Sequence, residues 1–124
     1  MEIIISNSSD KPIYEQIAYK IRMDILNGAL KEGDSLPSIR ALAKDLKVSV
    51  ITTKRAYEDL QKEGFISTVS GKGTFVSCTS KERLKEQNFK IIEKNLTECI
   101  SIAKASGITL DEFREIVNII FEEE

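Results

Sequence analysis

The stretch Ser38–Gly64, SIRALAKDLKVSVITTKRAYEDLQKEG, decides the fold of this chain. Its first part carries apolar side chains at the three- and four-residue spacing of one helix face, namely Ile39, Leu42, Ala43 and Leu46. The residues Lys47–Ser49 interrupt that spacing, and Ser49 is a good N-cap for a second helix that ends near Gly64. The predicted inward face of this helix consists of Thr53, Ala56, Tyr57 and Leu60. Two helices joined by a three-residue turn predict a helix-turn-helix motif.

An amphipathic helix is predicted upstream of this motif. Isoleucines recur every four residues from Ile13 to Ile25, which is the spacing of one helix face. Pro12 suits the first turn of such a helix, and Gly28 is placed to end it. The segment that follows, Lys31–Pro37 (KEGDSLP), is rich in turn-forming residues and is predicted to be a connection.

A β-hairpin is predicted downstream of Gly64, because the apolar period changes to two across Phe65–Ser77, FISTVSGKGTFVS. The glycines around Lys72 allow three interpretations: a phosphate-binding loop, a flexible linker or a hairpin tip. A phosphate-binding loop needs a GxxxxGK[ST] spacing and a helix directly after it, whereas strand residues follow here. A linker would not be flanked by two apolar strand segments. The sequence therefore places Lys72 at the tip of a hairpin.

The last third of the chain is predicted to be two helices. The first spans Ser80–Ser106 and stops at Gly107, and the capping-box pattern Thr109–Glu112 starts the second. Apolar residues of the first helix follow a short heptad pattern, and those of the second form an amphipathic face. Two helices bury too little surface to be stable alone, so we expect them to pack against a second copy of the chain; the alternative is an intramolecular clasp. The predicted dimer interface consists of Phe89, Ile92, Leu96, Cys99, Ala103, Phe113, Ile116, Val117 and Ile120.

Composition argues against several classes of function. The 124 residues include no histidine, which is the commonest metal ligand and the usual acid-base group near neutral pH. The two cysteines, Cys78 and Cys99, form no CxxC pair. We therefore expect no metal, no cofactor and no enzymatic activity. The N-terminus lacks the pattern of a signal peptide and no segment is long and apolar enough to cross a membrane, so a cytoplasmic protein is expected.

Together these elements predict an α+β chain that is mostly α: a winged helix-turn-helix domain in residues 1–78 and a helical dimerisation arm in residues 79–124. The segments LPSIRALA, AYEDLQKEGFI and GKGTFV, with the serine-capped helix between the first two, closely resemble the DNA-binding domain of GntR-family bacterial transcription regulators. The resemblance covers Pro12–Val76, about half of the chain. The short arm resembles that of the YtrA subfamily, which implies a dimer and often control of transporter operons.

The second helix of the motif is predicted to enter the major groove of DNA with its N-terminal residues against the base edges. Ser49 and Thr52 can donate hydrogen bonds, while Val50 and Ile51 can contact thymine methyl groups. Many relatives carry arginine or another polar residue at these two apolar positions, so the operator is expected to be richer in A·T there. The candidate residues of this helix are Ser49, Val50, Ile51, Thr52 and Lys54.

Two further sets of DNA contacts are predicted. The resemblance places Ser38 and Arg40 against the DNA at the start of the preceding helix, where Arg40 can span phosphate and base; the alternative is that Arg40 is one solvent-facing charge among many. The hairpin tip, Ser70–Lys72, is predicted to enter the minor groove, because glycine allows close approach and lysine meets the negative potential there. The alternative for the tip is a simple hairpin turn.

The resulting prediction is a dimeric transcription repressor of a small operon that binds an inverted-repeat operator in double-stranded DNA. Its effector is open, since the arm shows no obvious pocket. A winged-helix module that docks on another protein is the alternative, and would bind DNA weakly and without strong salt dependence. A small enzyme is a third class, disfavoured by the missing histidine.

Overall fold

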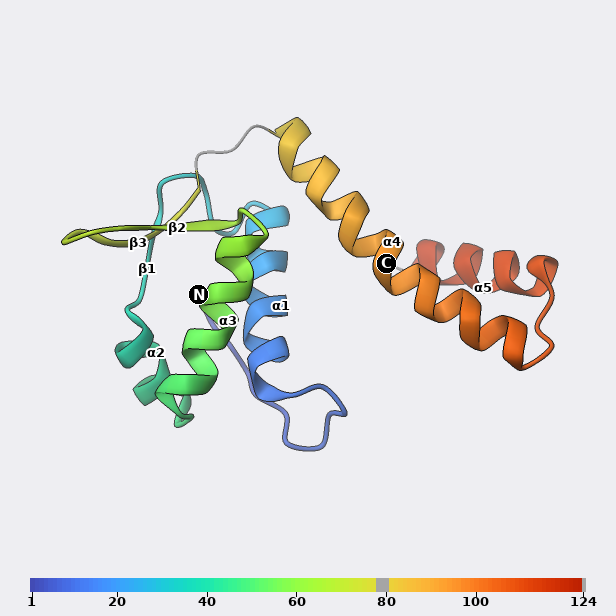
Figure 1. Cartoon of the computed structure of the whole chain (residues 1–124), viewed down its shortest axis with the longest axis horizontal. Coiled ribbons are helices and arrows are strands. Elements are labelled where there is room, and N and C mark those ends of the chain that lie inside the picture. Colours follow the sequence, from blue (N-terminus) through green and yellow to red (C-terminus); the bar gives the residue numbers. More distant parts are fainter. Residues whose placement is uncertain (78–80, 124) are drawn as a thin grey trace. The chain divides into compact units, whose positions relative to one another are not determined.

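The computed structural model describes residues 1–77 and 81–123 of the chain (Figure 1). Its elements are α1 (Ile13–Leu26), β1 (Ser35–Leu36), α2 (Ile39–Leu46), α3 (Val50–Lys62), β2 (Ile66–Val69), β3 (Gly73–Val76), α4 (Lys81–Ala105) and α5 (Leu110–Glu123). They form two compact units, Met1–Leu84 and Lys85–Glu124, which we call unit 1 and unit 2. In the described residues, no helix combines the length and apolar character that crossing a bilayer requires.

Unit 1 is a winged helix-turn-helix, as predicted. The helix α3 packs against both α1 and α2, and Figure 1 shows α1 and α3 beginning at the same end of the unit. The predicted inward face of α3 is buried, and the largest fully buried side chains are Ile17, Ile21, Thr53, Leu60 and Phe65. The core therefore lies between the three helices and the start of the hairpin.

Local hydrogen bonds explain where α2 and α3 begin. The Ser38 hydroxyl accepts a hydrogen bond from the backbone N–H of Ala41 at 3.1 Å, and Ser49 accepts one from Thr52 at 3.0 Å. Each serine thereby caps a helix N-terminus that would otherwise leave a backbone donor unpaired. Between the two helices, Lys47 has a left-handed backbone with φ of 57°. The predicted N-cap at Ser49 is confirmed.

The sheet is antiparallel with strand order β1-β3-β2. The hairpin is confirmed, because Ile66 pairs with Val76 and Val69 with Gly73. The prediction that Lys31–Pro37 is only a connection was incomplete, since it contains β1, which pairs with β3. A two-residue strand is too short to show a period of two.

Unit 2 contains most of α4 and all of α5. As predicted, the turn between them contains Gly107 in a left-handed conformation, with φ of 75°. The predicted capping box is also confirmed: Thr109 N–H donates to Glu112 Oε1 at 3.0 Å, and Glu112 N–H donates to Thr109 Oγ1 at 3.2 Å. The predicted helix start at Ser80 and the domain boundary between Cys78 and Thr79 lie outside the described residues.

The apolar faces of α4 and α5 remain largely exposed in the single chain. The two helices contact each other only sparsely, and Ala103 is the one buried apolar side chain among the described residues of unit 2. Ala103 is 6% exposed, so little of its side chain is on the surface of the single chain. Phe113 is half-buried, and the remaining members of the predicted dimer interface are exposed: Phe89, Ile92, Leu96, Cys99, Ile116, Val117 and Ile120.

Candidate nucleic-acid interface

The first turn of α3 presents two apolar side chains to solvent. Ile51 is 81% exposed and Val50 is 40% exposed, although both belong to a helix whose opposite face forms the core. An isoleucine with this exposure contributes little to the packing of unit 1. The start of α3 is thus an apolar surface that is available for contact with another molecule.

The two hydroxyl groups of this turn are bonded to each other. Ser49 Oγ donates to Thr52 Oγ1 at 2.7 Å while it accepts from the Thr52 backbone N–H. The prediction gave both side chains an outward donor. In this arrangement the Ser49 hydroxyl proton is used inside the turn, and the Thr52 hydroxyl proton remains available for an outside acceptor.

The charged residues of the helix-turn-helix differ in their partners. Lys54 is exposed and lies 3.8 Å from Glu58 Oε1, a long and solvated ion pair. Arg40 is exposed in the first turn of α2, two residues after the capping residue Ser38. Both cations are therefore accessible to a polyanion.

Tyr57 connects α3 to the start of α2. Its hydroxyl donates a hydrogen bond to the backbone carbonyl of Pro37 at 2.7 Å. Burial raises the pKa of Tyr57 from 10.0 to about 12, since the phenolate would lose its hydration. This bond holds the entry to α2, and with it Ser38, against the inner face of α3.

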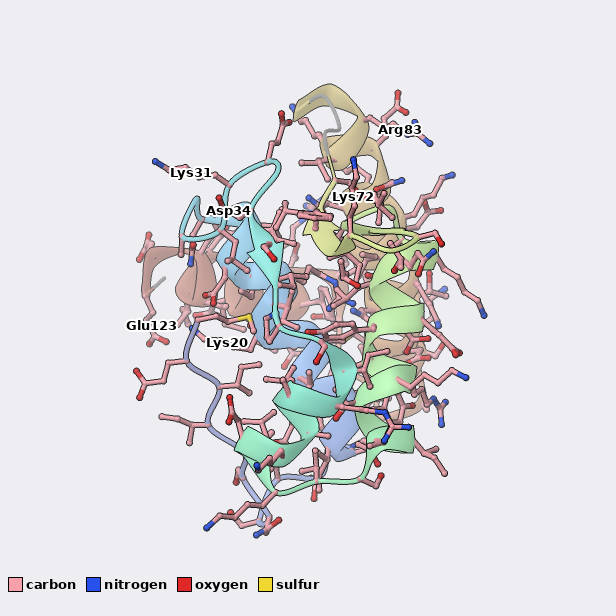
Figure 2. All side chains as sticks on the ribbon, turned by 90° about the vertical axis from the view of Figure 1, so that its left-hand side faces the viewer. Lys20, Lys31, Asp34, Lys72, Arg83 and Glu123 are labelled. Atoms are coloured by element: carbon pink, nitrogen blue, oxygen red, sulfur yellow. The ribbon has the colours of Figure 1, made fainter. Side chains whose placement is uncertain are left out.

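The hairpin turn carries the third set of predicted residues. The Lys72 N–H donates to the Val69 carbonyl at 2.9 Å and closes the turn. Gly71 and Gly73 have φ of 76° and 112°, values that side chains with a Cβ rarely adopt. Ser70, Gly71 and Lys72 are all exposed, and Figure 2 shows Lys72 on the ribbon of the hairpin.

All predicted DNA-contacting residues belong to unit 1, and the predicted dimer interface belongs to unit 2. Ser38, Arg40 and the first turn of α3 come together in one helix-turn-helix, while Ser70–Lys72 occupy the hairpin turn of the same unit. In residues 1–77 and 81–123, no group of three or more acidic or cysteine side chains is placed to hold a metal ion. Unit 1 thus presents a helix start with exposed apolar and basic groups, and a hairpin turn with the exposed Lys72.

Three comparisons relate this chain to known proteins. The family model described as "Bacterial regulatory proteins, gntR family" matches residues 13–76. The HTH-type transcriptional repressor YtrA of Bacillus subtilis is 36% identical over 118 residues, covering 95% of this chain and 91% of that protein. The structure of YtrA from Sulfolobus acidocaldarius, a GntR-family transcription factor, has a TM-score of 0.61 at 37% identity and covers 98% of this chain and 97% of that one.

A further solved structure contains DNA. The DNA-binding domain of AraR in complex with operator ORX1 is similar to this chain with a TM-score of 0.55 and 28% identity. The similarity covers 62% of this chain and 96% of the AraR domain. It therefore relates one DNA-binding domain, rather than the whole chain, to a protein bound to its operator.

Proposed function

Because the chain belongs to the gntR family of bacterial regulatory proteins, we propose that it is a dimeric repressor that occupies an inverted-repeat operator in front of a small operon. It is a DNA-binding transcription regulator with a winged helix-turn-helix, not an enzyme. The observation that carries the proposal is the exposed first turn of α3, where Ile51 is 81% exposed. We propose, beyond DNA binding, that the protein represses transcription, forms a dimer and binds a two-fold symmetric operator.

The first turn of α3 enters the major groove in this proposal. Val50 and Ile51 contact thymine methyl groups there, because apolar side chains cannot form hydrogen bonds with the base edges. Thr52 donates a hydrogen bond from its hydroxyl to a phosphate or a base. Lys54 gives up its long ion pair with Glu58 and binds the DNA instead. Ser49 contributes by capping the helix.

Two flanking contacts fix the orientation of α3 on the DNA. Ser38 and Arg40 approach the backbone at the start of α2, where Arg40 binds phosphate through its planar guanidinium. Ser70, Gly71 and Lys72 approach the minor groove from the hairpin turn. Contacts on both sides of a groove-reading helix set its register, which a single helix cannot do alone.

Unit 2 provides the dimer. The apolar faces of α4 and α5 are exposed in the single chain, as shown by Phe89 at 60% exposure. Since the two helices hardly cover each other, a second copy is the partner that buries both faces. One small module buries only about 600–1,000 Å² on DNA, so two modules are needed for a specific site. A two-fold dimer then requires an inverted repeat.

YtrA of Bacillus subtilis, which is described as a repressor, supports the sign of regulation that we propose. AraR, whose DNA-binding domain was solved on an operator, supports double-stranded DNA as the ligand.

Fluorescence anisotropy tests the proposal. The duplex upstream of this protein's own gene is titrated at 50 and 200 mM salt, beside a scrambled duplex of equal length. We expect tight, salt-sensitive binding to the first duplex, weakened in Arg40→Ala and Lys72→Ala. Lys94→Ala is the matched control, because it removes an exposed lysine of unit 2.

Two outcomes would overturn the proposal. Salt-insensitive weak binding to both duplexes would favour a module that docks on another protein. A monomer in light scattering at micromolar concentration would remove the dimer and leave unit 2 without a partner.

A further inference from the structure

The guanidinium of Arg55 in α3 lies over the ring of Tyr14 in α1. We propose that the Tyr14 ring holds the Arg55 guanidinium ready to bind a DNA backbone phosphate beside the groove-reading turn. The inference rests on the proposed function, since it assumes that α3 meets DNA. It adds a phosphate-binding residue and the aromatic side chain that positions it.

The geometry is that of a stacked pair. Arg55 Cζ lies 3.8 Å from the centroid of the Tyr14 ring. The contact of Arg22 with Phe65 is looser, with a corresponding distance of 5.7 Å. At 3.8 Å the planar guanidinium rests on the ring face, which leaves the N–H groups at its edge free to donate.

Those N–H groups have no protein acceptor. Arg55 is exposed, and within the described residues it has neither an ion pair nor a hydrogen bond. By contrast, Arg22 is paired with Glu63 at 2.8 Å, and Lys54 lies 3.8 Å from Glu58. A guanidinium that is held in place but not neutralised is suited to an external anion.

The position of Arg55 selects the phosphate backbone as that anion. Arg55 follows Ile51 by four residues and so lies on the same side of α3, one turn further from the capped helix start. Residues at the start of a recognition helix face base edges, whereas cations further along and beside it face the strands that border the groove. Tyr14 belongs to the first turn of α1, and α1 begins at the same end of unit 1 as α3 (Figure 1).

Stacking prepares Arg55 for this role. A free arginine loses side-chain freedom when it binds phosphate, and a guanidinium already held by a ring loses less. The Tyr14 hydroxyl donates to Glu15 Oε1 at 3.3 Å, so it is the ring rather than the hydroxyl that serves Arg55. Two substitutions of Tyr14 should therefore differ in their effect on DNA binding: Tyr14→Phe keeps the ring, and Tyr14→Leu removes it.

The test measures operator affinity at 50 and 200 mM salt for wild type, Arg55→Ala, Arg55→Lys, Tyr14→Phe and Tyr14→Leu. Each phosphate contact contributes about 0.9 to the slope of log K against log salt. The defect of Arg55→Ala should therefore be about threefold larger at 50 than at 200 mM salt. It should be equal on operator and scrambled duplexes, because phosphate carries no sequence information.

The tyrosine variants test positioning. Tyr14→Phe should bind as wild type, and Tyr14→Leu should bind more weakly. The Tyr14→Leu defect should disappear in the Arg55→Ala background, because a positioning residue acts only through its partner. Arg55→Lys should keep the salt slope and lose affinity, since an ammonium retains the charge but not the planar stack. Thermal melting of each variant reports whether the fold is kept.

The results separate this inference from the proposed function. If wild type binds its operator selectively and Arg55→Ala leaves the salt slope unchanged, the phosphate contact is wrong while the regulator stands. If Arg55→Ala lowers the slope but Tyr14→Leu is additive with it, Arg55 binds phosphate without help from Tyr14, and the positioning role is wrong. If wild type binds no DNA, both proposals fail.

Discussion

Arg22 of α1 and Glu63 at the end of α3 form a two-pronged ion pair: Arg22 Nε donates to Glu63 Oε2 at 3.0 Å, and Nη2 donates to Oε1 at 2.9 Å. Both side chains are largely shielded from solvent. The pair joins α1 to α3 immediately before the chain enters β2. The stack of Tyr14 on Arg55 is a second contact between the side chains of α1 and α3.

Loss of this ion pair should destabilise unit 1. Glu63→Gln is expected to lower the free energy of unfolding by about 1–3 kcal/mol, because Arg22 would keep its charge in a partly buried place without a carboxylate. Urea denaturation measures the change. Glu58→Gln is the matched control: its partner Lys54 is exposed and 3.8 Å away, so the effect should stay below about 1 kcal/mol. Equal effects of the two variants would contradict the structural role of the pair.

Tyr57→Phe should destabilise the protein at neutral pH and change its response to alkali. Loss of the hydroxyl leaves the Pro37 carbonyl without its donor, which costs about 1–3 kcal/mol. The pKa of Tyr57 is 10.0 unfolded and about 12 folded, so its contribution is complete below pH 10 and is lost as the pH rises from 10 to 12. Urea midpoints at pH 8 to 11 measure the difference between wild type and variant. A difference that does not shrink above pH 10 would contradict the burial of the phenol.

The capping box of α5 should respond to acid. Hydrogen bonds from the Thr109 backbone N–H and hydroxyl lower the pKa of Glu112 below its ordinary value of 4.5. The carboxylate therefore stabilises the helix start fully above pH 4.5, and this stabilisation is lost as the pH falls through the lower folded pKa. An NMR titration of the Glu112 carboxyl carbon measures it. In Thr109→Ala the pKa should move back toward 4.5, and an unchanged titration would rule out the hydroxyl as a cause.

Ile51 should be sensitive to a single methyl group in the DNA. Replacing thymine by deoxyuridine within the operator removes one methyl from the major groove and should weaken wild-type binding by about 0.8 kcal/mol, or roughly fourfold, at the contacted position. Ile51→Ala should bind both duplexes equally, with unit 1 as stable as wild type because the side chain is 81% exposed. Anisotropy titrations with deoxyuridine placed at one thymine at a time would locate the contact. The same loss in wild type and variant would assign the effect to DNA shape.

The helices, the helix-turn-helix and the hairpin were predictable because their signals are local. Apolar spacing, the serine cap at Ser49 and the helix-ending glycines act within a few residues of one another, so they can be recognised in sequence. The candidate residues in the first turn of α3 follow from the same local pattern. Even there, the mutual hydrogen bond of Ser49 and Thr52 was not predicted, because the use of a hydroxyl proton depends on side-chain geometry.

The sequence by itself thus determined the order and type of every element except β1, and the family to which the chain belongs. Only the tertiary structure decided which distant residues meet: β1 exists because β3 supplies its partners, Arg22 reaches Glu63, and the Tyr14 ring carries Arg55. It also decided that Ala103 is buried while its neighbours on α4 stay exposed. These contacts join residues that are far apart in the chain, where no periodicity or cap leaves a trace, and they form only when the helices pack.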